Sequence, residues 1–202
     1  MLIRRAAILL LLSALAVLLD HAVPELPQPV RSALFLLAVA LAIAAFHRHV
    51  LQLFVGHAGD PLPDRVTRCA IKAGVPVSCL LFDRTGKGDA MALGLRLRGP
   101  GSIYLSGRVL DHLEDDESLS FVIRHEHEHN QGRHSLIPLF ALLASGLPVL
   151  MIPAFWISEI LADRAAAKSG FAAEGIPFNS IDLLHPPGCI RRMMASQWVL
   201  RR

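Results

Sequence analysis

Residues 124–134 read RHEHEHNQGRH, and this run decides how the rest of the chain is interpreted. It contains the pattern HExxH, with His125 and His129 four positions apart and Glu126 directly after the first histidine. Positions i and i+4 of an α-helix share a face, so both imidazoles can bind one zinc ion through bonds of about 2 Å. Glu126 lies beside them, where a carboxylate can act as a general base toward water without ligating the metal. The pattern predicts a helix with two zinc ligands and a catalytic base.

The other charged residues of this run are expected to have different roles. His127 lies about 200° around the helix from His125, so its side chain should point away from the metal. Glu128 is displaced from the metal, and Arg124 or Arg133 can neutralise it. Taken alone, the run is also compatible with a solvated, charged helix that is rich in histidine.

A third ligand is expected in the stretch SEILADRAAAKSG, residues 158–170. Glu159 and Asp163 are again four positions apart on a predicted helix. Glu159 can complete a His₂Glu site that keeps a fourth position open for water. Asp163 lies one turn further on, where its carboxylate can orient a ligating histidine by accepting the other ring N–H. The alternative is that both acids simply lie on the surface of a helix.

The segments before the HExxH run predict a small α+β domain. Residues 60–74 read as a helix with proline at its start and glycine at its end. Residues 75–83, 90–98 and 102–106 are rich in β-forming residues and are separated by glycine-containing turns, which predicts a small sheet. Residues 108–113 predict a short helix. Acidic residues then open the helix that carries HExxH.

The N-terminal part is expected to lie in a membrane. The chain of 202 residues is 53% hydrophobic and only 18% charged, which is unusually apolar for a soluble domain. Residues 6–19 and 32–46 are uncharged and are joined by a proline-rich turn. We predict a two-helix membrane anchor over residues 1–56 and a catalytic domain over residues 57–202. The alternative is a signal peptide followed by a buried helix.

Charge and cysteine content indicate in which compartment the protein lies and which kinds of partner are not expected. Arginines precede the first apolar stretch and follow the second, so both ends of the anchor are expected on the cytoplasmic side of the inner membrane. No basic run interleaved with aromatic residues is present, so nucleic-acid binding is not expected. Cys69, Cys79 and Cys189 form no CxxC pair, which favours free thiols in a reducing compartment.

A second apolar segment lies between the two candidate ligand stretches. Residues 135–157 are uncharged and long enough to cross a bilayer as one helix. A single crossing would leave His129 and Glu159 on opposite sides of a hydrocarbon core about 30 Å thick. Pro138, Gly146, Pro148 and Pro153 interrupt the segment. We therefore predict a helical, hydrophobic hairpin insert that returns to its starting side.

These motifs together resemble a known family. HExxH followed by ExxAD, here HEHEH and EILAD, is similar to the HtpX-like and CAAX-prenyl-protease-like integral-membrane zinc metallopeptidases. GDAMALG at 88–94 and LLHPPGCIRRM at 183–193 resemble further segments of that family in the same order. The resemblance covers about Asp60 to Met194. Asp89 stands where the family usually has asparagine.

The resemblance implies an α+β, zincin-like catalytic domain, mainly helical with a small sheet, beside N-terminal transmembrane helices. It implies a Zn²⁺-dependent endopeptidase that cleaves proteins or peptides, above all membrane proteins in quality control, and that contacts the lipid bilayer. We predict His125, His129 and Glu159 as ligands, Glu126 as the base and Asp163 as the orienting carboxylate. His185 of the HPP segment is a candidate oxyanion donor, although it can equally be a histidine at the start of a helix.

Substrate binding and the reaction class leave alternatives open. Residues 102–106 can bind an extended substrate as an added strand, or can be purely structural. A site-two-type intramembrane protease is a second possibility, but its HExxH should lie inside an apolar span. A catalytically idle zinc protein that acts as a scaffold or sensor is a third, and a small transporter subunit is a fourth.

Overall fold

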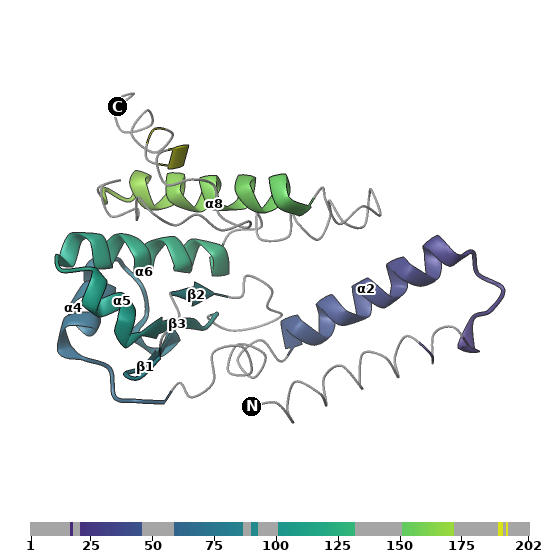
Figure 1. Ribbon diagram of the computed structural model, residues 1–202, viewed down its shortest axis with the longest axis horizontal. Helices are drawn as coiled ribbons and strands as arrows, with labels where there is room; N and C mark the ends of the chain where they lie inside the picture. Colours follow the sequence, from purple (N-terminus) through teal and green to yellow (C-terminus); the bar gives the residue numbers. More distant parts are fainter. Residues whose placement is uncertain are drawn as a thin grey trace.

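The structure is a computed structural model that describes residues 17, 21–45, 59–86, 90–92, 101–131, 151–171, 190–191 and 193. Its elements follow in the order α2 (Gln28–Ala45), α4 (Asp64–Lys72), a 3₁₀ turn η1 (Val77–Cys79), β1 (Leu80–Asp83), β2 (Met91–Ala92), β3 (Ile103–Ser106), α5 (Gly107–His112), α6 (Asp116–Gln131) and α8 (Met151–Lys168). Figure 1 shows three layers, with α6 between the sheet and α8. The α+β expectation is confirmed for the described residues.

The sheet is small and mixed. Its strand order is β1-β3-β2, with β1 parallel to β3 and β2 antiparallel to it. Leu80 pairs with Ile103 at the start of the parallel pair, and Met91 pairs with Tyr104 in the antiparallel pair. All four residues of β3 are buried, which agrees with its central place.

The central place of β3 decides between the two alternatives for residues 102–106. An extended substrate cannot be added beside β3, because this strand already has a neighbour on each side. Its backbone hydrogen-bonding groups therefore serve the sheet, and the strand is structural. In the described sheet the end strand nearest α6 is β2, which contacts that helix directly.

Helix α4 begins and ends as its sequence predicts. Pro63 precedes it with an extended backbone. Proline is common at the start of a helix, because the N–H that it lacks would have no partner within the helix there. After Lys72 the chain leaves the helix through Gly74, whose φ of 67° is in the left-handed region that favours glycine. Val66, Cys69 and Ala70 form the buried face of α4, at the i, i+3, i+4 spacing of an amphipathic helix.

Polar side chains fasten α4 to the start of α6. Arg65 donates through Nε to Asp116 Oδ1 at 2.8 Å and through Nη2 to the Leu113 carbonyl at 2.6 Å. Lys72 is ion-paired with Glu117. Arg65 is partly exposed and its partner Asp116 and the Lys72–Glu117 pair are exposed, so each pair contributes little to stability. Their effect is to fix the position of the first turn of α6 against α4.

Helix α6 is buried on more than one face because it lies between the sheet, α4 and α8. Leu119 and Ile123 belong to the hydrophobic core with no exposed surface. His125, His127 and Asn130 are also buried, at 5%, 5% and 3% exposure. A solvated, histidine-rich helix is therefore not what the structure contains. Buried polar side chains need partners, and most of the site's geometry follows from where those partners lie.

Helix α8 begins within the segment assigned to the hairpin insert. Residues 151–157, assigned to the hairpin insert, belong to the same helix as Glu159. Pro153 does not interrupt it, because it is the third residue of the helix, where the amide has no partner within the helix. Residues 135–150 lie outside the described part, so the hairpin itself stays a prediction.

Small side chains let α8 approach α6 closely. Ala154, Ser158, Ala162 and Ala166 follow one another every four residues and are all buried. Such a stripe on one side of a helix lets its backbone come near a neighbour, here α6. Close approach matters because a glutamate on α8 must reach histidines on α6.

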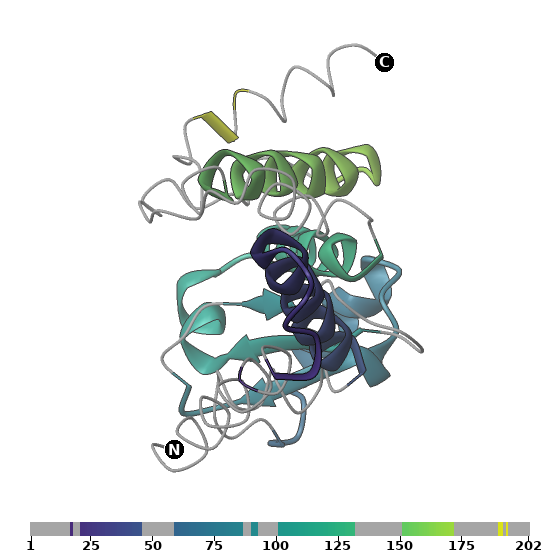
Figure 2. The same cartoon turned by 90° about the vertical axis from the view of Figure 1, so that its right-hand side faces the viewer.

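The N-terminal expectations are only partly covered by the described residues. Helix α2 begins at Gln28, four residues before the predicted apolar stretch, directly after the proline-rich turn. Figure 2 shows α2 pointing away from the layered body toward the viewer. Within the described residues, no helix is both long and apolar enough to cross a membrane. Residues 6–16 and 18–19 of the first predicted span and residue 46 of the second lie outside the described residues. Cys69 and Cys79 are buried and are not joined by a disulfide, and Cys189 lies outside the described residues.

Candidate metal centre

Two imidazoles of α6 converge on one point. His125 and His129 lie one helical turn apart, and their Nε2 atoms approach to 3.1 Å. Their rings meet edge to face, with centroids 4.8 Å apart and an interplanar angle of 79°. This is the arrangement that the i, i+4 spacing predicts, and it aims both nitrogens at the space in front of α8.

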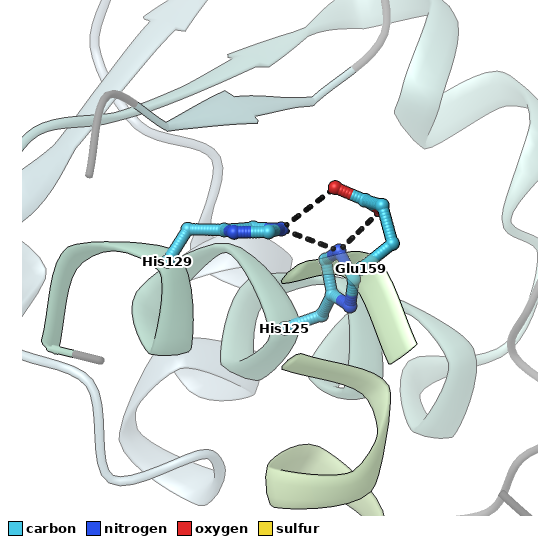
Figure 3. Close-up of side chains that lie close together, drawn as sticks. All are labelled: His125, His129 and Glu159. Carbon is cyan, nitrogen blue, oxygen red and sulfur yellow. Dashed lines mark hydrogen bonds and ion pairs between the residues drawn. The ribbon is translucent and has the colours of Figure 1, made fainter. Parts of the chain in front are cut away.

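Glu159 of α8 supplies a carboxylate at the same point. Its Oε1 lies 3.0 Å from His129 Nε2 and its Oε2 lies 3.3 Å from His125 Nε2. Figure 3 shows the carboxylate pointing at both rings from the neighbouring helix. One ligand atom from each of the three residues lies within 4.8 Å of the others. Two helices remote in sequence thus contribute to one cluster.

The spacing of these atoms fits a tetrahedral ion. Ligands bonded at 2.0–2.1 Å at tetrahedral angles lie about 3.3 Å apart. The two imidazole nitrogens lie 3.1 Å apart, close to that value, and the two oxygens of Glu159 each face one nitrogen, Oε1 at 3.0 Å from His129 and Oε2 at 3.3 Å from His125. Two imidazole nitrogens and one carboxylate oxygen are a donor set that zinc accepts, with room for a fourth ligand. The residues present therefore fit the predicted Zn²⁺.

Asp163 lies behind His125, as the sequence predicted. Its Oδ1 lies 2.8 Å from His125 Nδ1, and the side chain is almost fully buried. A carboxylate at this nitrogen favours a proton on Nδ1, which would leave Nε2 as the atom that binds a metal. Asp163 thus lies where a carboxylate that orients His125 would have to lie.

The electrostatics of the cluster favour positive charge. Burial alone would lower the pKa of His125, but the neighbouring carboxylates of Asp163 and Glu159 outweigh burial and raise that pKa to about 10. Burial favours the neutral acid of Glu159, yet hydrogen bonds from His125 and His129 hold the pKa of its carboxyl well below the usual range. Both imidazoles therefore sit beside an ionised carboxylate, which is the environment a cation needs.

One charged residue of the site was missed by the sequence analysis. Arg191 is only 6% exposed and reaches both oxygens of Asp163, with Nε 2.7 Å from Oδ2 and Nη2 2.8 Å from Oδ1. Its Nη2 also lies 3.5 Å from Glu159 Oε2. The signal was present in LLHPPGCIRRM, where only His185 was singled out. Two buried acids one turn apart on α8 also require a nearby cation.

The other charged residues of the HExxH run lie partly where the sequence predicted. Glu126 is half-buried and is close enough to Arg191 to add to the negative charge around the guanidinium. His127 is not part of the His–His–Glu cluster, and its Nε2 lies 3.3 Å from Gln131 Nε2. Glu128 is ion-paired with Arg124, which confirms one of the two expected partners.

Asn130, the residue after His129, fastens the end of α6 to the sheet. Its Nδ2 donates to the Ser102 carbonyl, directly before β3, at 3.2 Å. Gly101 leaves the space for this side chain, since a Cβ there would lie 2.2 Å from Asn130 Cγ. No pattern in the sequence pointed to Asn130. Asp89 and His185 lie outside the described residues, so their predicted places stay untested.

Comparison with known proteins gives one match. The family model for peptidase family M48 matches residues 60–188, which include the HExxH run, Glu159, Asp163 and the HPP segment. Arg191 lies three residues beyond the matched range. The searches of curated proteins and of solved structures gave no match.

Proposed function

Because the chain belongs to peptidase family M48, a family of metallopeptidases, we propose that it is a zinc-dependent endopeptidase. One observation carries the proposal. Glu159 meets the two histidines of the HExxH helix, with one carboxylate oxygen at 3.0 Å from His129 Nε2 and the other at 3.3 Å from His125 Nε2. A helix with HExxH alone lacks this convergence, and a carboxylate from a second helix supplies it.

The choice of zinc rests on the donor set. Two imidazoles and one carboxylate suit Zn²⁺, and the three-ligand arrangement with an open fourth position is typical of catalytic rather than structural zinc. When bound, zinc supplies Lewis acidity, which activates water and polarises a carbonyl. His125, His129 and Glu159 would hold it, and Asp163 would keep His125 oriented.

Glu126 is proposed as the general base. It follows His125 on α6, is near enough to Arg191 to interact with it electrostatically, and is not one of the three residues of the cluster. In the reaction Glu126 takes the proton of the attacking water at a carboxylate oxygen and delivers it to the leaving amine. His185 stays a predicted oxyanion donor.

An extended peptide would bind along β2. In the described sheet β2 is an end strand, and it contacts the helix that carries the metal ligands. A peptide added there would gain backbone hydrogen bonds and would pass in front of α6. This arrangement replaces the strand at 102–106 as the place where substrate is held.

Membrane attachment and membrane-protein substrates, in quality control, belong to the same proposal. Val30, Leu34, Leu37 and Leu41 form an exposed apolar stripe on α2, and lipid would cover such a surface. Both ends of the anchor and the catalytic domain would face the cytoplasm. Thiol-labelling tags placed after Arg133 and after Lys168 should then react from the same side. Labelling from opposite sides would refute the hairpin and exclude Glu159 as a ligand.

The central experiment compares two glutamates of one helix. Glu126→Gln in the full-length protein should abolish chelator-sensitive cleavage of casein while the bound zinc stays stoichiometric, because an amide keeps the shape but cannot accept the proton. Glu128→Gln is the matched control, since its partner is Arg124, and it should keep both cleavage and zinc.

The outcomes separate the alternatives. Wild-type cleavage by Glu126→Gln would refute the assigned base. Zinc binding by a wild-type protein that cleaves no substrate would favour an idle scaffold or sensor. A site-two-type enzyme is not favoured, because α6 packs against the sheet and begins with two acidic residues.

A further inference from the structure

Arg191 is a buried charge whose neighbours are the two acids of α8. It is separated from Asp163 by 28 residues in sequence, yet both groups are nearly inaccessible to solvent. A charged guanidinium is not buried without partners that satisfy it. The partners here are both carboxylate oxygens of Asp163 and, at longer range, Oε2 of Glu159.

The contact is a planar fork rather than a point contact. Nε approaches Oδ2 at 2.7 Å and Nη2 approaches Oδ1 at 2.8 Å, so the guanidinium and the carboxylate are held in one relative orientation. The same Oδ1 lies 2.8 Å from His125 Nδ1. Fixing the carboxylate plane therefore fixes where the acceptor for the His125 proton lies.

Glu159 is part of the same arrangement. Two carboxylates one turn apart on α8 repel each other, and both are less than 8% exposed. Arg191 Nη2 lies 2.8 Å from one and 3.5 Å from the other. The guanidinium thus places one positive charge between the metal ligand and the carboxylate that orients another ligand.

We propose that Arg191 is a positioning residue of the metal centre, an inference that rests on the proposed function. It locks the carboxylate of Asp163, through which it orients His125, and it holds the carboxylate of Glu159 in place. The chain of contacts runs from the guanidinium to Asp163, to His125 Nδ1 and across the ring to Nε2. A residue beyond the range that the family model matches thereby completes the site.

The test measures metal binding rather than cleavage. Zn²⁺ affinity of the full-length protein is measured by competition with a chromophoric chelator, and ligand geometry is read from the visible spectrum of bound Co²⁺. Partners outside the ligand set change metal affinity by about 10–100-fold when removed. Arg191→Met should therefore weaken Zn²⁺ binding by at least about tenfold and change the Co²⁺ spectrum.

Two further variants control the result. Arg191→Lys keeps the charge but cannot form the fork, so its affinity should lie between those of the wild type and Arg191→Met. Arg65→Met removes another arginine–aspartate pair from the far end of α6, with Asp116 as the partner. It should leave the Zn²⁺ affinity and the Co²⁺ spectrum unchanged, because only the packing of α4 is altered.

Each outcome of these measurements either supports or overturns the inference about Arg191. Wild-type affinity and spectrum in Arg191→Met would overturn the inference while leaving the peptidase proposal intact. If Arg191→Met does not fold, Arg191→Lys decides alone: weakened binding with a changed spectrum supports the inference, and wild-type values overturn it. A wild-type protein that binds no Zn²⁺ would overturn both this inference and the proposed function.

Discussion

Replacing Asp163 by asparagine tests the buried charge network directly. Three donors face the carboxylate: Arg191 Nε at Oδ2, and Arg191 Nη2 and His125 Nδ1 at Oδ1. Asparagine has one acceptor oxygen and one NH₂ group. Whichever way the amide is turned, its NH₂ faces at least one of these donors, and Arg191 loses its full counter-charge.

The expected cost is large because the site is almost completely buried. Removing one partner of a buried ion pair typically costs about 3–5 kcal/mol, since an uncompensated charge is left behind. For a chain of this size each kcal/mol lowers the melting temperature by about 2–4 °C. The metal-free Asp163→Asn protein should therefore melt about 6–20 °C below the metal-free wild type.

The assay is a double-mutant cycle on the metal-free full-length protein. Thermal unfolding is followed for the wild type, Asp163→Asn, Arg191→Met and the double variant. Because the two side chains are in direct contact, the double variant should be less destabilised than the sum of the single ones, by about 0.5–3 kcal/mol. Additive effects, or a melting temperature of Asp163→Asn within 2 °C of the wild type, would refute the reasoning.

Three other expectations concern the core, the sheet and the metal. Burial raises the pKa of Tyr104 to about 12, so the stability that its neutral hydroxyl contributes is present below pH 10 and is lost as the pH rises toward 12. Denaturant unfolding from pH 9 to 11 should show about half of this fall, roughly 1.4 kcal/mol of a total of about 2.7 kcal/mol, in the wild type but not in Tyr104→Phe. Gly101→Ala should displace Asn130 and cost about 1–3 kcal/mol of unfolding free energy in a denaturant titration; an unchanged midpoint would contradict the close contact. A chelator should lower the melting temperature of a protein saturated with zinc at 1,000 times its Kd by about 8–16 °C, because such binding contributes about 4.1 kcal/mol; equal melting curves with and without chelator would argue against a folded metal site.

Local features of this protein were readable from its sequence. The approach of His125 and His129 follows from helical periodicity alone, which needs no knowledge of other elements. The chain leaves helix α4 through Gly74 because a left-handed backbone favours glycine, and the sequence carries that signal at the right place. The place of Glu159 was suggested by its spacing from Asp163 and by a family resemblance.

Features that depend on tertiary packing were not readable in this way. The strand at 102–106 was recognised, but its central place depends on the order in which three strands pair, which the alternation of side chains does not specify. Arg191 was missed because its partners are 28 or more residues away and only the packing of α8 brings them near. The extension of α8 to Met151 was missed because Pro153 was read as a break.

Because one cluster bridges α6 and α8, metal binding would also restrict the unfolded chain. A metal bound by His129 and Glu159 would close a loop of about 30 residues, and a cross-link of that span removes roughly 3–4 kcal/mol of chain entropy from the unfolded state. The penalty grows slowly, so doubling the loop would cost only about 0.6 kcal/mol more. The segment between the two helices can therefore lengthen or shorten while the same reversible metal cross-link forms between its ends.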